Sequence, residues 1–476
     1  MMTTCSLALL MLVAACSDKA TDPKPENPTQ ELTLSEQNLV RAMELTDNAI
    51  AAHFTGDGMA MARYYNPYTK VRSDEKGSVW MYTSAIEAVN AILHALEAQK
   101  AHGNAAFYDE HFNKYSDLLY KLYENVDYYL GTFELVSYTQ TKEWSVYGVH
   151  RSGSKGSAQV AGIENVYDDQ MWLIRELLEG YKVTGKSQYL QKAEYLTGYV
   201  LDGWDCTRDA NGEERGGIPW GPGYVTKHAC SNGPMVSPLV WLHELYKDKS
   251  DAVTHRYIDA ADKQTRLTTE VKKSDYYLDF AKKIYAWQKD ELLRADGVYD
   301  DMRGGCSPGS PETETINGTV YRKGTTCQDR VGPAISYNSG TMLSGAADLY
   351  RVTGENAYLE DARKLSDASF GYFAKLGVTK PDYYTYDISG FRNWFNGVLM
   401  RGYVDVYPAY PATSDYIDSF QKNLDYGYEN FLHEGFLPTN LLVGWSRDNA
   451  NNRTEGMFSF AFAAEYAVLS RYELEK

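Results

Sequence analysis

Tyr181-Lys-Val-Thr-Gly-Lys-Ser-Gln-Tyr-Leu-Gln-Lys-Ala193 recurs further along the chain as Tyr350-Arg-Val-Thr-Gly-Glu-Asn-Ala-Tyr-Leu-Glu-Asp-Ala362. Seven of the thirteen positions are identical, at an offset of 169 residues. In both copies a pattern of helical period ends at Thr-Gly, where glycine can adopt the left-handed conformation that closes a helix, and a new pattern opens at Tyr-Leu. The repeat therefore predicts two copies of a helical hairpin with a tight turn.

The same helical period extends over nearly the whole chain beyond residue 33. Apolar residues recur at spacings of three and four, and strand-like alternation is scarce. Short and long connections alternate between the predicted helices, which are residues 35–54, 79–99, 106–130, 167–184, 187–203, 235–247, 252–293 (with a break left open), 335–353, 355–376, 391–408, 413–433 and 456–474.

Six hairpins with all their long loops on one side predict an all-α fold, the (α/α)6 toroid or barrel. In this architecture six inner helices line a central hole and six outer helices surround them. An α-solenoid would also contain hairpins, but it would show a shorter and more regular period. Because function usually collects on long loops, we expect the site at the mouth of the hole where these loops gather.

The composition fits an acidic globular protein of 476 residues, with 47 Lys+Arg against 64 Asp+Glu and a formal charge of −17. This balance, with no basic run and no glycine-rich phosphate loop, argues against a nucleic-acid partner. Tyrosine is unusually frequent, with 40 copies. A flat apolar ring with a hydroxyl suits helix packing and also stacking on carbohydrate, and the composition leaves both open.

The first 33 residues predict an export signal and a tether. Leu7 to Ala15 is a short apolar run followed by Cys16, which fits a signal peptide over residues 1–15 ending in a bacterial lipobox, although no Lys or Arg precedes the run. Cys16 would be lipidated, and the proline-containing residues 16–33 would form a disordered tether before one helical domain at 34–476. Ser17 and Asp18 favour anchoring in the outer membrane, at the cell surface or the periplasmic face.

Four further cysteines lie in the helical domain, and an exported chain tolerates disulfides. Of the three possible pairings, 206–230 and 306–327 close short polar loops and are the ones we expect. Zinc is the alternative, because His228 lies beside Cys230. The chain has no Cys-x-x-Cys or His pair at ligand spacing, so we expect neither a metal nor another cofactor.

Asp168 and Asp169 are the strongest catalytic candidates, because they lie where a long loop enters a predicted inner helix. Neighbouring helical residues place their carboxyl groups about 5–6 Å apart, close to the roughly 5–5.5 Å of a retaining glycosidase. Two such charges also push their pKa values apart, so one carboxyl can stay protonated as the acid.

The same pair could instead be a helix cap and a partner of the helix dipole. In the repeat, Asp168 and Asp169 align with Tyr337 and Asn338, and an asparagine can cap as well as an aspartate. A second pair, Asp300-Asp301, lies in a glycine-containing segment and is predicted to be a solvated turn.

Several polar and aromatic residues occur where long loops meet the predicted inner helices, and these junctions are expected to bind sugar. Trp220 follows Gly216-Gly217-Ile218-Pro219 on a glycine-rich turn. The candidate substrate-binding residues are Tyr167, Trp220, Lys227, Asn232, Tyr337, Asn338 and Arg401.

Taken together, these motifs resemble glycoside hydrolase family 76. The resemblance rests on Tyr167-Asp168-Asp169-x-x-Trp172, Gly216-Gly217-Ile218-x-Trp220, Lys227 with Asn232, Tyr337-Asn338-x-Gly340, Leu349-Tyr350 with Thr353-Gly354, and Phe395-x-Gly397-Val398-x-x-Arg401, in order over roughly residues 60–475. Pro219 and the segment bounded by Cys306 and Cys327 depart from the family pattern.

The resemblance implies an (α/α)6 catalytic domain over residues 34–476 and an endo-α-1,6-mannanase that acts with retention. Asp168 would be the nucleophile and Asp169 the acid/base, and the partner would be α-mannan or its oligosaccharides. The chain would act as a monomer and reach the membrane only through its lipid. Two other functions stay open: a non-catalytic glycan-binding outer-membrane lipoprotein, and another (α/α)6 glycosidase such as an unsaturated-uronide hydrolase.

Overall fold

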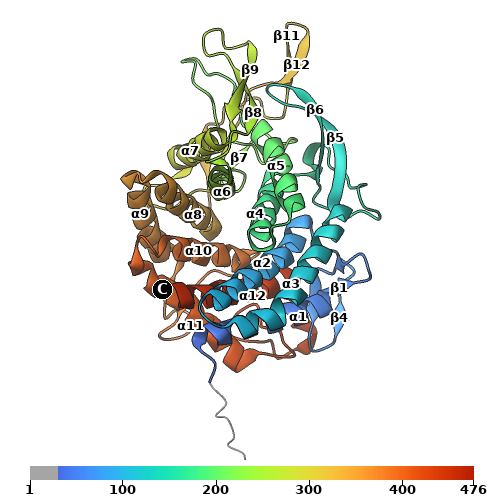
Figure 1. Ribbon diagram of the computed structural model, residues 1–476, viewed down its shortest axis with the longest axis vertical. Helices are drawn as coiled ribbons and strands as arrows, with labels where there is room; N and C mark the ends of the chain where they lie inside the picture. Colours follow the sequence, from blue (N-terminus) through green and yellow to red (C-terminus); the bar gives the residue numbers. More distant parts are fainter. Residues whose placement is uncertain (1–30) are drawn as a thin grey trace, which may run out of the picture.

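The computed structural model describes residues 31–476, so the predicted signal peptide, Cys16 and almost all of the tether lie outside the described residues. The described chain forms twelve α-helices (Figure 1). They are α1 Leu34–His53, α2 Val79–Ala101, α3 Ala105–Val126, α4 Tyr167–Thr184, α5 Ser187–Asp202, α6 Val236–Tyr246, α7 Lys273–Leu292, α8 Ser336–Thr353, α9 Asn356–Phe373, α10 Arg392–Val406, α11 Ser414–Phe431 and α12 Gly456–Glu475.

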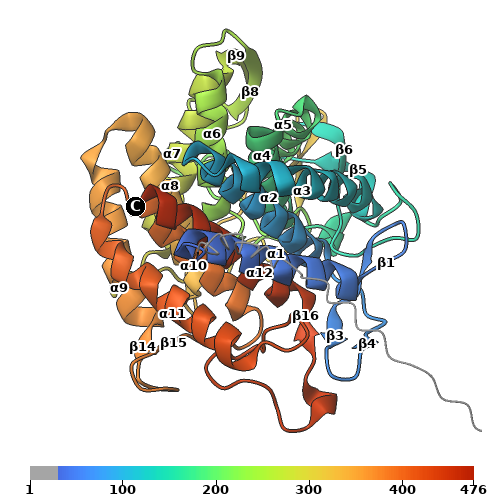
Figure 2. The same ribbon diagram turned by 60° about the horizontal axis from the view of Figure 1, so that its bottom comes forward.

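The even-numbered helices form a closed inner ring, in which α2 contacts α4, α4 contacts α6, and so on until α12 contacts α2 again. Each odd-numbered helix packs outside one inner helix, and α1 pairs with α12, so the two ends of the domain lie side by side (Figure 2). The predicted (α/α)6 barrel is therefore confirmed.

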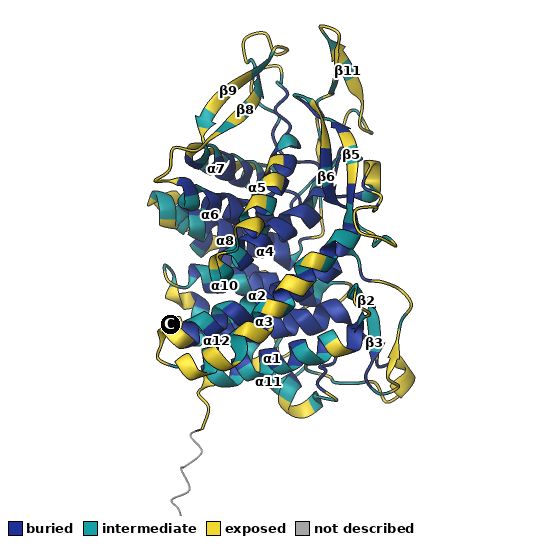
Figure 3. Ribbon diagram, turned by 45° about the vertical axis from the view of Figure 1, so that its right-hand side comes forward, coloured by how far each residue is buried: buried dark blue, intermediate teal, exposed yellow. Residues whose placement is uncertain are grey.

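The sequences of the two rings explain their places. α12 is apolar or small on nearly every side and is buried along most of its length, whereas α3 buries one stripe at spacings of four, three and four (Tyr115, Leu119, Leu122 and Val126; Figure 3). Inner helices can also approach closely. A Cβ on Gly340 of α8 would lie 2.6 Å from the carbonyl oxygen of Val398 on α10.

The repeated segment forms the tight turns that its sequence predicts. Gly185 and Gly354 close α4 and α8 in the left-handed conformation, with φ of 66° and 68°. Their N–H groups donate to the carbonyl oxygens of Tyr181 and Tyr350, each at 2.8 Å.

The prediction of a helix over 252–293 is wrong in its first half. Residues 252–272 form an antiparallel hairpin of β8 (Ala252–Ile258) and β9 (Arg266–Lys272), and only α7 is helical. The reason is visible in the chain: Val253, His255 and Tyr257 alternate with more exposed residues, which is the period of a strand, and the paired strand is rich in β-branched residues.

The remaining strands are short and lie in the long connections. They are β1 Phe54–Thr55, β2 Ala60–Met61, β3 Tyr64–Asn66, β4 Val71–Arg72, β5 Leu130–Val136, β6 Thr141–Tyr147, β7 Lys227–His228, β10 Met302–Gly304, β11 Thr313–Ile316, β12 Thr319–Arg322, β13 Asp329–Val331, β14 Lys375–Leu376, β15 Tyr384–Thr385 and β16 Thr454–Glu455. All pairings are antiparallel, and the sheet β13-β10-β7 ties the connections before α6 and α8 together.

One of the two expected disulfides is present. Cys306 and Cys327 are bonded, as predicted, within the connection between α7 and α8. The predicted 206–230 bond is wrong, because neither cysteine is bonded to another among residues 31–476. Cys206 is buried shortly after α5, whereas Cys230 lies beside Asp168 at the start of α4. Within residues 31–476, no helix is both long and apolar enough to cross a membrane.

Candidate active site

The two aspartates lie in the first turn of α4 and do not cap it. Val166 occupies the cap position with an extended backbone and no side-chain cap bond, and the N–H of Tyr167 donates to the carbonyl oxygen of Trp220 (2.8 Å). Asp168 and Asp169 are therefore the second and third helical residues, and the alternative reading of the pair as a cap does not hold.

The two carboxyl groups differ in pKa, and burial is the main cause of both shifts. It raises the pKa of Asp168 to about 6, although the nearby Cys230 thiol, Trp220 indole and first-turn N–H groups act in the opposite direction. Burial, reinforced by the charge of Asp168, holds the pKa of Asp169 well above its ordinary value. The pair titrates as a unit. Of the two carboxyl groups, Asp169 is therefore the one that keeps its proton to higher pH, and Asp168 is the one that ionises first.

An aromatic wall stands next to Asp168. Trp220 stacks on His228, with ring centroids 5.0 Å apart and planes 27° apart, and Tyr224 lies 4.7 Å from Trp220. Burial lowers the pKa of His228 to about 4, so the imidazole is neutral. The indole N–H of Trp220 faces the Asp168 carboxylate and stabilises its ionised form. Flat, uncharged rings beside a carboxylate are suited to stacking on a sugar.

An aromatic layer lies beside the aspartates near the starts of the inner helices, and we define it as Trp80, Trp172, Tyr337, Trp394 and Phe395. Tyr337 stacks on Phe395 (5.2 Å, 21°), and Trp172 meets Trp394 edge to face (4.7 Å, 78°). Tyr337 is close enough to Cys230 and Asp168 that burial and these groups raise its pKa. The predicted residue Tyr337 therefore lies beside the pair.

Lys227 lies away from the mouth, in a buried ion pair. Its ammonium donates to Asp205 Oδ2 (2.9 Å) and to the carbonyl oxygens of Gly216 (2.6 Å) and Thr325 (3.3 Å). The side chains of Lys227 and Asp205 are 4% and 0% exposed. All three ammonium donors are thus used to hold the loops around the site.

This arrangement predicts a loss of stability for Lys227→Met. The substitution leaves the Asp205 carboxylate buried without its cation, which costs about 3–5 kcal/mol. Urea unfolding should show this fall in the free energy of unfolding. Lys323→Met is the matched control, because Lys323 pairs with Glu312 in solvent and should contribute less than about 1 kcal/mol. Unchanged stability with a raised KM would instead make Lys227 a substrate ligand.

Three other predicted residues also hold the structure around the site. Asn232 is fully buried and bonds through its amide to the backbone of Ile218 and to the carbonyl oxygen of His228. Tyr167 is buried against Tyr199, with centroids 5.0 Å apart. Asn338 donates to the carbonyl oxygen of Asp300 (3.4 Å). None of these three has the exposed surface that sugar contact requires, so we leave them and Lys227 out of the proposed substrate-binding set.

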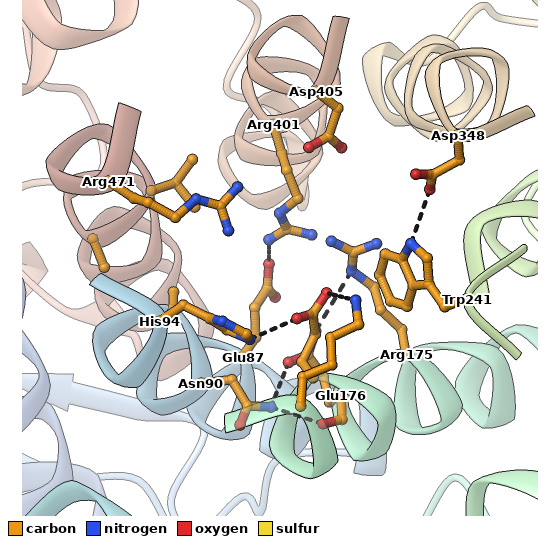
Figure 4. A pocket seen from close by; sticks show the side chains of 15 residues that line it. Glu87, Asn90, His94, Arg175, Glu176, Trp241, Asp348, Arg401, Asp405 and Arg471 are labelled. Carbon is orange, nitrogen blue, oxygen red and sulfur yellow. Dashed lines mark hydrogen bonds and ion pairs between the residues drawn. The ribbon is translucent and has the colours of Figure 1, made fainter. Parts of the chain in front are cut away.

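Arg401 lies in a different part of the barrel. It follows the first residue of α10 by nine positions, about 13 Å along the helix axis. There it donates to Glu87 in a cavity that we call the basal cavity (Figure 4). None of the residues around the aspartate pair lines this cavity, so Arg401 is not brought to the candidate active site.

Sequence reasoning missed two neighbours of the pair. Cys230 was assigned to a disulfide, because paired cysteines are common in exported chains. Asp301 was assigned to a solvated turn, but its carbonyl oxygen accepts from Ala229 N (2.8 Å), and burial raises the pKa of its carboxyl. The Asp-Asp motif at 300–301 was the available signal. Among residues 31–476, no three His, Cys, Asp or Glu side chains are grouped to hold a metal ion.

Comparison with known proteins gives one family. Residues 137–263 and 259–470 match the model of glycosyl hydrolase family 76. No curated protein matches the chain in sequence.

Solved structures share the fold. A family 76 mannosidase from Bacteroides thetaiotaomicron has a TM-score of 0.65 and 20% identity, covering 92% of this chain and 99% of that chain. An α-1,6-mannanase from Salegentibacter sp. has a TM-score of 0.57 and 19% identity, covering 92% of this chain and 99% of that chain. That structure is a complex with α-1,6-mannotriose of a variant that is inactive because two consecutive aspartates were replaced by asparagine. A family 76 α-mannanase from Bacteroides thetaiotaomicron has a TM-score of 0.61 and 16% identity, covering 92% and 96%.

Proposed function

Because this chain belongs to glycoside hydrolase family 76 and is thus a glycosidase, we propose that it is a retaining endo-acting enzyme that cleaves α-1,6-mannosidic linkages in a mannan backbone. One observation carries the proposal: two adjacent carboxyl groups at the start of an inner helix have proton affinities that suit a nucleophile and an acid. The related α-1,6-mannanase that binds α-1,6-mannotriose, inactive after loss of two consecutive aspartates, supports the linkage and the pair.

In the proposed reaction Asp168 attacks the anomeric carbon of the mannosyl unit from the face opposite the leaving oxygen. Asp169 donates its proton to that oxygen as the glycosidic bond breaks, and a covalent mannosyl–Asp168 ester forms. Asp169, now ionised, removes a proton from water, which displaces Asp168 and restores the starting state. Two inversions give net retention. Every proton and electron pair is supplied by the two carboxyl groups and water, so no cofactor is required.

The surroundings of the pair fit a neutral polysaccharide. The aromatic wall formed by Trp220, Tyr224 and His228 is uncharged, and the whole chain carries a formal charge of −17. An acidic protein repels a polyanion such as a uronide chain and imposes no such penalty on mannan. We propose Trp220 as a substrate contact, since it is only half-buried beside Asp168, whereas Tyr337 is buried beside Asp168 like the residues left out above.

Digestion of unbranched α-1,6-mannan tests the activity. Purified protein should convert the polymer first into a ladder of oligosaccharides, because an endo-acting enzyme cuts inside the chain. Mannose as the first and only product would contradict endo action. Binding of the mannan in calorimetry without any hydrolysis would favour a glycan-binding protein, and release of unsaturated uronic acid from other oligosaccharides would favour the uronide hydrolase.

The pH dependence of kcat/KM should be bell-shaped. Activity needs Asp168 ionised, so it should fall as the pH drops below about 6, the pKa of Asp168. It also needs Asp169 protonated, so it should fall again on the alkaline side, once the raised pKa of Asp169 is passed. A profile from pH 4 to pH 10 on mannan oligosaccharides measures both limbs. A rate that keeps rising to pH 10 would show that no protonated carboxyl is needed.

We further propose that the protein is a monomer anchored in the outer membrane by a lipid on Cys16, after removal of residues 1–15. The apolar run before Cys16 and the tether after it support this proposal. Radiolabelled palmitate should enter the wild-type protein and not the Cys16→Ser variant. Equal labelling of both would rule out Cys16 as the lipidated residue.

A further inference from the structure

The basal cavity lies at the end of the barrel opposite Asp168 and has a volume of about 270 Å³. Asp168 lies near the first turn of α4 and Lys182, at the rim of the cavity, near its last turn, about 21 Å further along the helix. All six inner helices contribute to the walls of the cavity. The lining residues include Asn90 and His94 from α2, Arg175 from α4, Trp241 from α6, Asp348 from α8, Arg401 from α10 and Arg471 from α12.

Three guanidinium groups from different helices point into the cavity, those of Arg175, Arg401 and Arg471 (Figure 4). The Arg175 and Arg401 side chains are each only 11% exposed. Within residues 31–476, Arg175 and Arg471 donate no hydrogen bond, and the nearest carboxylate oxygens lie 3.7 Å and 3.4 Å from their Nε atoms. In the same described part of the chain, Arg401 donates only to Glu87. Each guanidinium has five N–H donors, so most donors facing the cavity are unused.

The carboxylates of the cavity, in contrast, already have donors in the wall. Glu87 accepts from Trp394 as well as Arg401, Glu176 from Asn90, Glu179 from Lys182, Asp348 from Trp241 and Arg351, and Asp405 from Ser344. Each of these carboxylates therefore has at least one donor, whereas the guanidinium groups of Arg175 and Arg471 have no acceptor among residues 31–476. A ligand that fills the cavity has to supply acceptors.

Keeping the charged Arg401 guanidinium in this cavity is also energetically unfavourable. Burial and the neighbouring Arg471 outweigh the nearby carboxylates and lower the pKa of Arg401 to about 10. An oxyanion between Arg401 and Arg471 would offset the repulsion between these two groups, and with Arg175 it would form charge-assisted bonds, for which guanidinium has the right fork geometry. The cavity volume of about 270 Å³ lies just below the roughly 300–1,000 Å³ of pockets for drug-sized ligands, so it suits a small ligand.

We propose that the basal cavity binds a small oxyanion, a carboxylate or a tetrahedral anion such as phosphate or sulfate, between Arg175, Arg401 and Arg471. The site is separate from the aspartate pair and does not depend on the proposed hydrolysis. Among the described residues Arg175 and Arg471 donate no hydrogen bond. Replacing them by glutamine removes the ion pairs with Glu176 and Glu475 and the contact of Arg175 with the Trp241 ring, but it leaves every hydrogen bond of the described chain in place.

Calorimetric titration of the full chain tests the proposal. Sodium phosphate, sodium sulfate and sodium succinate are titrated separately at constant ionic strength set with sodium chloride, so that the arms distinguish tetrahedral anions from carboxylates. We expect one saturable site per chain for at least one of them. Arg175→Gln and Arg471→Gln should each lower its affinity at least about tenfold. Arg447→Gln, which replaces an exposed arginine in a loop, is the control and should bind as the wild type does.

Circular dichroism in chloride alone establishes that each variant is folded, and a crystal soaked with selenate shows the place of binding. An anomalous peak between the three guanidinium groups is the expected result. The absence of saturable binding of all three anions, or binding that survives in the Arg175→Gln/Arg471→Gln double variant, would overturn the proposal. So would a cavity that contains only water after the soak.

Discussion

Asp168→Asn should yield a folded protein that hydrolyses α-1,6-mannan at least about 10³-fold more slowly than the wild type, because the amide cannot form the covalent ester.

The same substitution should raise the thermal midpoint at pH 7. Burial raises the pKa of Asp168 from 3.8 to about 6, so the folded state binds this proton more tightly than the unfolded state. The protonated Asp168 therefore destabilises the fold little at low pH. As the pH rises through 6 and Asp168 ionises, the free energy of unfolding falls by up to about 3 kcal/mol.

Measuring both properties separates a catalytic role from a structural one. Replacing an aspartate that serves the structure would lower the stability of the fold. Replacing a buried nucleophile should instead raise it, because the buried charge destabilises the fold and is kept for the reaction. Asp117→Asn, on the exposed face of α3, is the control and should change neither property. Normal turnover of mannan by Asp168→Asn, or the loss of its fold, would contradict the role given to Asp168.

Asp169→Asn should lower kcat on mannan by about 10²- to 10⁴-fold, since the leaving sugar then departs without a proton. The loss in the first step should be much smaller on an aryl α-mannoside whose phenolate leaves unaided, because that step needs no acid. The alkaline limb of the pH profile should also disappear, since the group that titrates there has been removed. Stopped-flow release of the phenolate, followed by steady-state turnover, measures both steps.

Azide distinguishes the two carboxyl groups directly. In Asp168→Ala, azide can attack the anomeric carbon from the vacated side in one inversion, so the product should be the β-mannosyl azide. In Asp169→Ala, azide replaces water in the second step and should give the α-mannosyl azide. An exchange of these two products between the variants would reverse the assignment of nucleophile and acid/base.

The helices were predictable because their signals are local. The Thr-Gly turns at 184–185 and 353–354 and the apolar spacing of three and four are read within a few residues, and they lead to the hairpins and hence to the closed ring. The hairpin at 252–272 was missed, since a few alternating residues next to a true helix were read as its extension. To decide between a helical and a strand period for these residues, one has to know which side chains are buried, and the sequence alone does not give this.

The loop residues were less predictable, because their partners are remote in sequence. Lys227 bonds to Asp205 and to Thr325, which is 98 residues away, and no local pattern indicates that this lysine points away from the mouth. Arg401 is a different case. Its distance from the start of α10 follows from the rise per residue, so its place below the aromatic layer could have been predicted from the helix boundary.

The anomeric form of the first product tests the central claim most directly. Proton NMR of wild-type protein acting on a linear α-1,6-manno-oligosaccharide should show the new reducing end first as the α anomer, with the β anomer appearing only as mutarotation proceeds. This result is required if Asp168 forms a covalent intermediate that Asp169 helps water to release. A β anomer as the first product would show a single inversion, and it would contradict the account of the aspartate pair.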